Sequence, residues 1–241
     1  MRGLSPYVSL YPWLLAACLA AASCTLPPSG DPAKPVAAQV NVQAAPPTPH
    51  TAKIYRIDPA TSSLHILVYR GGTLVRLGHN HVISSRSISG SIWRGATLHE
   101  SGFLITVPVN ALIVDDNDAR AAEGDDFPLN LTEDAKQGTK ANMLRDTLLD
   151  GAHYPDISIQ SVSLQGDANA PRVLVAMRIK DQTRQIAVPV TLRSADGSLR
   201  VKGEFEIRQS NFGIAPLSVA LGALLVLDTL KIKFELVAQA D

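Results

Sequence analysis

From Tyr55 onward the chain is a succession of short apolar segments, each bounded by glycine, proline, asparagine or aspartate. Within most segments apolar and polar residues alternate, as they do in a β-strand, where successive side chains point to opposite faces. Strands that follow one another over short turns pair antiparallel and form a barrel or a sandwich, whereas a parallel sheet needs crossover helices. The predicted strands are residues 63–70, 82–93, 102–109, 157–165, 172–180, 185–193, 199–207 and 224–237.

Individual strands add detail to this pattern. Residues 63–70 (SLHILVYR) are apolar on both faces, and residues 224–237 form the most apolar part of the domain. Gly90 weakens the strand at 82–93 and indicates a bulge or a bend. The sequence Ala195-Asp196-Gly197 predicts a tight hairpin turn between two of the later strands.

One segment interrupts the strands and predicts a helix. Thr132 is a good N-cap residue, and the two acidic residues after it suit the positive end of a helix dipole. We expect the helix to continue through Met143 and Leu148 and to stop at Gly151. Its apolar face belongs to the core or to a ligand wall, with the core favoured. The expected fold class is all-β, with one helical insertion.

The segment before this helix, residues 115–126, is strongly acidic. Carboxylates in a loop can bind calcium, but the spacing lacks the central glycine and closing glutamate of an EF-hand loop. A solvated loop is the favoured interpretation of this run.

The N-terminal region predicts export. Residues 1–24 combine a positive start with an apolar run and are typical of a signal peptide, and of a bacterial lipoprotein signal in particular. The lipidated residue would be Cys24 or Cys18, with Cys24 favoured. A plain signal peptide cut near Ala22, or an uncleaved anchor, is the alternative. Residues 25–52, rich in proline and alanine, predict an extended tether, and residues 53–239 predict one β-domain.

Charge and cysteine content exclude several kinds of function. The 22 basic and 22 acidic side chains balance, whereas a general nucleic-acid binder would be basic. A small ligand, a lipid or a protein partner therefore remains open. Both cysteines precede the predicted domain, which excludes cysteine catalysis and cysteine-based zinc sites within it. No nucleophile elbow or covalent heme motif is present, although non-covalent heme binding through a histidine stays open.

The densest group of reactive side chains is His79-Asn80-His81. Two histidines at this spacing can bind a metal ion if a third ligand converges on them, and His65, His99 or His153 would have to supply it. Alternatively, the three side chains are a polar anchor for the head group of a lipid. The simplest interpretation is a structural turn, since both residue types tolerate left-handed backbone.

Four short motifs, in order, resemble the YceI family of lipocalin-like, polyisoprenoid-binding proteins. They are YRIDPATSS (55–63), YPDISI (154–159), DQTRQI (181–186) and RQSNFGI (208–214). The third lacks the histidine and glycine of the family's corresponding turn. His79 and His81 also stand where no family role can be transferred. The resemblance covers residues 55–237.

The resemblance implies an elongated antiparallel lipocalin-like β-barrel that holds an isoprenoid-type lipid, in an exported, periplasmic protein. Together with the lipoprotein-type signal, it predicts a periplasmic or envelope protein anchored to a membrane. Burial of about 0.8 kcal/mol per CH2 would let such a lipid bind with few polar contacts. We expect no enzyme activity, no cofactor and no nucleic acid partner, and leave the oligomeric state open. A metal- or heme-binding protein that uses His79 and His81 is the alternative. The candidate ligand-binding residues are His79, Asn80, His81, Leu64, Ile66, Val68, Met143 and Phe212.

Overall fold

The computed structural model describes residues 52–241. The predicted signal peptide, the predicted lipidation site at Cys24 and almost all of the predicted tether lie outside these residues, so those predictions stand as they are. The strands of this described part fall between Lys53 and Ala240, and residues 25–241 contain all of them.

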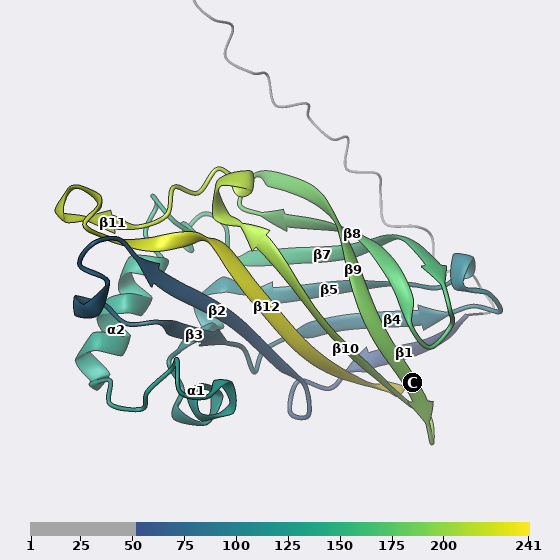
Figure 1. The fold of residues 1–241 in the computed structure, drawn as a ribbon. Coiled ribbons are helices and arrows are strands. Elements are labelled where there is room, and N and C mark those ends of the chain that lie inside the picture. The colour runs from purple at the N-terminus through teal and green to yellow at the C-terminus, as the bar shows by residue number, and fades with distance from the viewer. Residues whose placement is uncertain (1–51) are drawn as a thin grey trace, which may run out of the picture. The chain divides into compact units, whose positions relative to one another are not determined.

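Eight antiparallel strands close into a barrel (Figure 1). The ring closes where the first strand pairs with the end of the last, through Tyr55 opposite Ala240. The alternating segments therefore pair as the sequence predicted, and the all-β barrel class is confirmed. In spatial order the strands are β1 (Lys53–Ile57), β4 (Ser89–Arg94), β5 (Gly102–Pro108), β7 (Asp156–Gly166), β8 (Pro171–Ile179), β9 (Gln182–Ala195), β10 (Ser198–Arg208) and β12 (Leu224–Ala240).

A second group of strands extends the sheet beside the ring. β2 (Ser63–Gly71) pairs with the first half of β12, next to β1, and continues into β3 (His81–Ser84) and β6 (Ile113–Val114). The short β11 (Ser218–Val219) pairs with the start of β12. β12 can serve both groups because it is 17 residues long.

The predicted strand at residues 82–93 is wrong as a single strand. The structure splits it into β3, which pairs with β2 and β6, and β4, which pairs with β1 and β5. Gly90 lies inside β4 without any break in register, so it does not mark a bulge. Its φ of 143° and its position against the carbonyl of Leu104 explain the glycine, since a Cβ would come within 2.1 Å of that oxygen. The turn at Asp196 joins β9 to β10 as predicted.

Two helices lie at one end of the domain, where the sequence predicted one. α2 (Glu133–Met143) begins as expected, with the Thr132 hydroxyl accepting from the Ala135 amide. It ends at Met143 instead of near Gly151, because the following residues form separate hydrogen-bonded turns, including one from Leu149 back to Met143. Neither helix in residues 52–241 has the length and hydropathy needed to cross a membrane.

The acidic run contains the second helix, α1 (Asn117–Glu123), so the prediction of a solvated loop is wrong. α1 covers the outer face of β2 and β3 over a small apolar cluster of Leu67, Val82, Ala119 and Phe127. Asp115 and Arg120 are fully buried beside this cluster. The helix forms because Asp116 accepts from the Ala119 amide as an N-cap, and alanines supply its apolar face.

Short 3-10 turns complete the fold, and they are η1 (Val75–Leu77), η2 (Leu98–Glu100), η3 (Val109–Ala111), η4 (Gln209–Phe212) and η5 (Ala220–Gly222).

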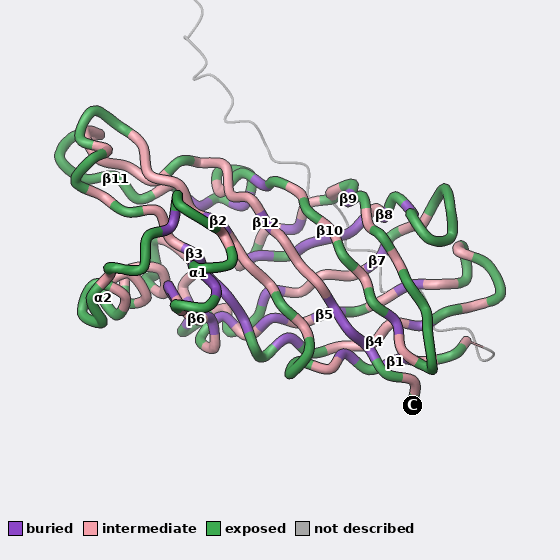
Figure 2. The backbone as a smooth tube through the Cα atoms, turned by 60° about the horizontal axis from the view of Figure 1, so that its bottom comes forward, coloured by how far each residue is buried: buried purple, intermediate pink, exposed green. Residues whose placement is uncertain are grey.

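Buried residues, purple in Figure 2, follow the strands along the barrel.

Candidate ligand-binding site

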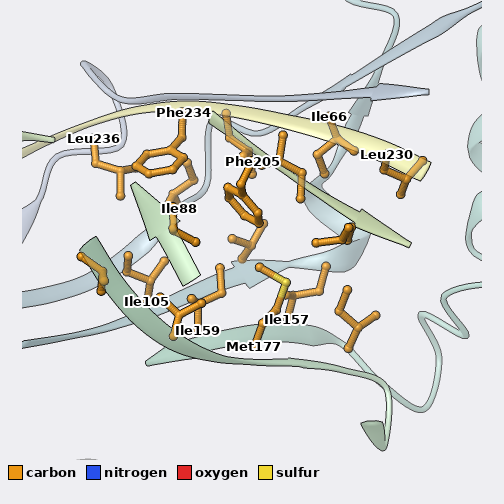
Figure 3. A pocket seen from close by; sticks show the side chains of 18 of the residues that line it. Ile66, Ile88, Ile105, Ile157, Ile159, Met177, Phe205, Leu230, Phe234 and Leu236 are labelled. Carbon is orange, nitrogen blue, oxygen red and sulfur yellow. The ribbon is translucent and has the colours of Figure 1, made fainter. Parts of the chain in front are cut away.

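The inward side chains of the barrel surround an apolar cavity of about 340 Å³ (Figure 3). This volume lies within the range of small-molecule binding sites. Buried core residues such as Ile88, Ile105 and Met177 line the cavity, and partly buried side chains complete the lining. The core of the domain and the candidate site therefore occupy the same place. Lining residues labelled in the figure are Ile66, Ile88, Ile105, Ile159, Met177, Phe205, Leu230 and Phe234.

Strand alternation determines which residues face the cavity. On β8, for example, Val173, Val175 and Met177 line it, with one outward residue between each pair. On β7 the register shifts between Ser161 and Ser163. Leu164 therefore lines the cavity, and Val162 is exposed. A bulge thus keeps the inner face apolar where strict alternation would not.

Several aromatic rings line the cavity. Phe205 on β10 and Phe234 on β12 meet edge to face, with ring centroids 6.3 Å apart and an interplanar angle of 71°. Trp93 lies at the end of β4 and is buried. All three line the cavity. Such rings suit an alkyl or prenyl chain, because they offer a large apolar surface at little cost in side-chain entropy.

Polar side chains are few in this lining. Arg94 at the end of β4, and Thr139 and Asn142 on α2, belong to elements that point to opposite ends of the barrel in Figure 1. The polar lining residues on described segments are His81, Arg94, Ser101, Thr139, Asn142 and Gln209.

The structure places six of the eight predicted ligand-binding residues around the cavity. Leu64, Ile66 and Val68 line it from β2, and Met143 and Phe212 line it near the α2 end. His81 also lines it, whereas His79 and Asn80 do not. Whether these residues contact a ligand stays a prediction. Most of the lining, on β4, β5, β7 to β10 and β12, was missed, although the alternation within the predicted strands indicated which residues would share a face.

His81 is fixed by a carboxylate that the sequence did not connect with it. Its Nδ1 lies 2.7 Å from Oδ2 of Asp115. The Val82 amide donates to the other carboxylate oxygen at 2.9 Å. Asp115 is held in place because its own amide donates to the Val82 carbonyl, next to the short β6 strand. The ring orientation of His81 is therefore set by main-chain pairing of β3 with the chain after β6.

Arg120 on α1 completes this polar cluster. Its guanidinium lies 2.5 Å from Oδ1 of Asp115 and also donates to the carbonyls of Asn80 and Pro128. Burial raises the pKa of the Asp115 carboxyl, but the hydrogen bonds from His81, Val82 and Arg120 outweigh burial and leave the pKa below its ordinary value. Asp115 is therefore an anion at neutral pH, and Nδ1 of His81 carries the proton that it shares with this anion.

The other two members of the motif have different surroundings. The Asn80 side chain accepts from the Arg70 amide and donates to the Asp126 carbonyl, which ties the chain after β2 to the chain after α1. Asn80 thus has a structural role, although neither His79 nor Asn80 adopts the left-handed backbone on which the interpretation as a turn was based. His79 is exposed. Partial desolvation, followed by the positive charges of His81, Arg70 and Arg120, lowers the pKa of His79.

The remaining histidines named as possible metal ligands lie elsewhere. His65 points outward and bonds to Glu123, and His153 bonds to Asp150. Within residues 52–241, no three His, Cys, Asp or Glu side chains converge as a metal site would require.

The ring of strands, the apolar cavity and the few polar groups at its ends define a class: a β-barrel that encloses an apolar ligand site. The match to a family model makes the class specific. Residues 55–238 match the YceI-like domain, and the chain belongs to this family.

Two solved structures share this fold. BcnA of Burkholderia cenocepacia superposes with a TM-score of 0.58 at 17% identity, covering 76% of this chain and 99% of that one. A polyisoprenoid-binding domain from Saccharophagus degradans gives 0.51 at 12% identity, with coverage of 78% and 98%. At these identities the likeness concerns the fold. A comparison with curated protein sequences gave no match.

Proposed function

We propose that the barrel binds a single isoprenoid-type lipid, such as a polyprenyl or quinone-like molecule, along its cavity. The observation that carries the proposal is the lining, which is apolar through the middle of the barrel and polar only toward the ends. Each buried CH2 of a prenyl chain contributes about 0.8 kcal/mol, so such a chain needs no polar anchor along its length. The family and the polyisoprenoid-binding domain of similar fold support the same ligand class.

His81 is the group that we assign to the head of this lipid. Nδ1 is bonded to Asp115, and Nε2 has no hydrogen-bond partner among residues 52–241. In the neutral ring Nε2 accepts, which suits a prenyl hydroxyl, and in the protonated ring it donates, which suits a phosphate or a quinone carbonyl. Asp115 orients the ring for either bond, much as a carboxylate orients a metal-bound or catalytic histidine.

We also propose where this binding takes place. The predicted lipoprotein signal, lipidation at Cys24 and the tether of residues 25–52 would hold the barrel at a bacterial envelope membrane, in the periplasm. The protein would then carry or shield its lipid there and not transform it, in keeping with a family of binding proteins.

The test is native mass spectrometry of residues 25–241, which contain the whole barrel, purified gently from a bacterial host. We expect an added mass that fragments as a prenyl chain. In His81→Phe, which fills the same space without hydrogen bonds, we expect at least a tenfold weaker retention of that lipid. Loss of one charge-assisted hydrogen bond of about 1.5–3 kcal/mol sets this scale.

The matched control is His99→Phe, because His99 is exposed on η2 and is not part of the cavity lining. Retention in this variant should equal that of the wild type. A protein that stays bare even after incubation with polyprenol, or that carries only a metal ion, would contradict the proposal. Equal retention in both variants would remove His81 from the site and leave the apolar cavity as the binding element.

A further inference from the structure

The exposed apolar side chains of the domain gather at one place. Of the nine large hydrophobic residues exposed within residues 52–241, six lie on residues 71–78 and 217–227, which we call the apolar tip. Single exposed apolar residues are ordinary on soluble proteins, but a contiguous group marks an interaction surface. The six are Leu74, Leu77, Leu217, Val219, Leu221 and Leu227.

The two segments of the apolar tip lie side by side although they are far apart in sequence. The Leu74 amide donates to the Ala223 carbonyl at 2.7 Å. Gly71 is so close to Leu227 that a Cβ would approach its side chain to 2.7 Å. Figure 1 shows β11 and the connection from β2 to β3 projecting beyond the same end of the barrel as α2. The leucines of both segments therefore form one surface.

Charge is almost absent from the apolar tip. Residues 209–227 contain no Asp, Glu, Lys or Arg, and Arg76 is the one charged residue among residues 71–78. The nearest charges along the chain are Arg70, Arg208 and Asp228, and the Asp228 carboxylate is hydrogen-bonded to the η4 turn. The tip itself is therefore apolar, and the charged residues that flank it along the chain carry a net positive charge.

The backbone of the tip holds one leucine outward in an unusual conformation. Leu221 has φ 56°, between Ala220 at 51° and Gly222 at 88°, and its relative exposure is 109%. A left-handed conformation is unfavourable for residues other than glycine, and backbone of this kind is concentrated at functional positions. The conformation presents an apolar side chain entirely to the surroundings.

The tip is also continuous with the cavity. Leu217 on one side of β11 and Val226 at the start of β12 line the cavity, and both belong to the apolar tip. We infer that the apolar tip docks on an anionic lipid bilayer, so that a lipid passes between membrane and cavity over apolar surface. The inference rests on the proposed function, and it names the membrane as the partner of that site.

A bilayer fits these observations better than a second copy of the chain. A two-fold interface needs the same patch to be complementary to itself, and a protruding loop needs a pocket opposite. A bilayer accepts protruding leucines directly, and its anionic head groups complement Arg70, Arg76 and Arg208.

The position of the predicted tether agrees with docking on the anchoring membrane. β1 begins at Lys53, at the end of the barrel away from β11 (Figure 1). At about 3.3 Å per residue, residues 25–52 can span on the order of 90 Å, whereas β12 is about 56 Å long. An anchored barrel could therefore turn its tip onto the membrane that holds it.

The experiment is flotation of residues 25–241, which lack the signal and the lipidation site, with vesicles of equal parts phosphatidylethanolamine and phosphatidylglycerol. Wild type should float with the vesicles, and Leu77→Asp/Leu221→Asp should lose at least tenfold in partitioning. The matched control is Leu104→Asp/Val162→Asp, which adds the same charge at exposed apolar positions on β5 and β7 and should float like wild type. Circular dichroism confirms that each variant is folded.

The inference would be overturned by no flotation of the wild type, by equal flotation of the tip variant, or by equal loss in the control. A wild-type dimer that does not float and that the tip variant converts to a monomer would also overturn it, and would assign the tip to a second copy. Mass spectrometry of bound lipid separates this test from the proposed function. A barrel that retains prenyl lipid but does not float contradicts membrane docking and leaves the proposed lipid binding intact. A barrel that floats but never holds lipid contradicts the proposed lipid binding and leaves docking intact.

Discussion

At the scale of single residues, Asp115 connects three parts of the molecule. It follows β6, accepts the Val82 amide on β3 and pairs with both His81 and Arg120. A buried ion pair adds little net stability compared with a well-packed apolar pair, but removal of one partner leaves the other charge buried and unpaired. The main effect of the cluster is therefore to fix the position of His81. Its effect on the free energy of unfolding appears when one of the charged partners is removed.

We predict that Asp115→Asn destabilises the domain by about 3–5 kcal/mol, because Arg120 loses its buried counterion. The double variant Asp115→Asn/Arg120→Met should recover most of this loss, because it removes the stranded charge. Denaturant unfolding of the wild type and the variants measures both effects. An Asp115→Asn variant within about 1 kcal/mol of the wild type would contradict the role given to the cluster.

The lowered pKa of Asp115 also predicts that the stability of the domain depends on pH. The pKa of Asp115 is lower in the folded state than in the unfolded chain, so between these values the unfolded state binds more protons. The stabilisation is complete above the unfolded pKa and is lost as the pH falls through the folded pKa. Over this acidic range the wild type should lose more stability than Asp115→Asn/Arg120→Met. Parallel pH profiles of the two proteins would assign the acid sensitivity to other carboxylates, such as Glu123. Burial raises the pKa of Glu123, but its interactions with Lys233 and His65 outweigh this effect and lower the pKa.

At the scale of elements, two glycines show how local geometry decides what a position tolerates. Gly90 lies in β4 with a positive φ and with the neighbouring strand against it. Gly138 lies in α2 with open space where a Cβ would be. The first site cannot hold a side chain without moving β5, whereas the second would gain helix propensity from one.

We therefore predict opposite effects of the same substitution. Gly90→Ala should destabilise the barrel by at least about 2 kcal/mol, through the strained φ and the contact with the Leu104 carbonyl. Gly138→Ala should stabilise it by about 0.5–1 kcal/mol. Thermal unfolding of the two variants beside wild type is sufficient, and a Gly90→Ala protein as stable as wild type would show that β4 and β5 are not paired as described.

The elements also show what could be predicted from the sequence. Strand alternation and the Thr132 cap depend on neighbouring residues, so an antiparallel all-β fold and the start of α2 were predictable. The choice of a barrel over a sandwich came from the family resemblance. The course of residues 82–93 depends on pairing with strands distant in sequence, and no local signal marks the division. The burial of Asp115 depends on Arg120 and His81 together, whereas acidic composition alone indicated a solvated loop. For that reason His81 was predicted without the carboxylate that orients it.

At the scale of the whole molecule, the core and the ligand site coincide. In most globular domains side chains fill the interior to the density of an organic crystal. Here the inward residues of seven of the eight ring strands, all except β1, surround a cavity together with β2. The empty barrel therefore lacks apolar contacts that a bound lipid would supply, and the lipid acts as a missing part of the core.

This arrangement predicts a large effect of ligand on stability. Protein freed of lipid by reverse-phase extraction and refolding should melt well below the protein as purified, and added polyprenol should restore the difference. The free energy of unfolding should rise by about 1.4 kcal/mol for each tenfold excess of lipid over Kd. Calorimetry with and without lipid measures the shift, and identical transitions would mean that the barrel packs equally well when empty.

A barrel whose interior is completed by its cargo has a further property in a living cell. Proteases act on molecules that open, and the open fraction falls as stability rises. Empty copies would therefore be degraded sooner than filled ones, and the amount of protein at steady state would follow the supply of lipid. Because of the cavity in its core, the rate at which the protein is degraded would depend on the supply of lipid, without a separate sensor protein.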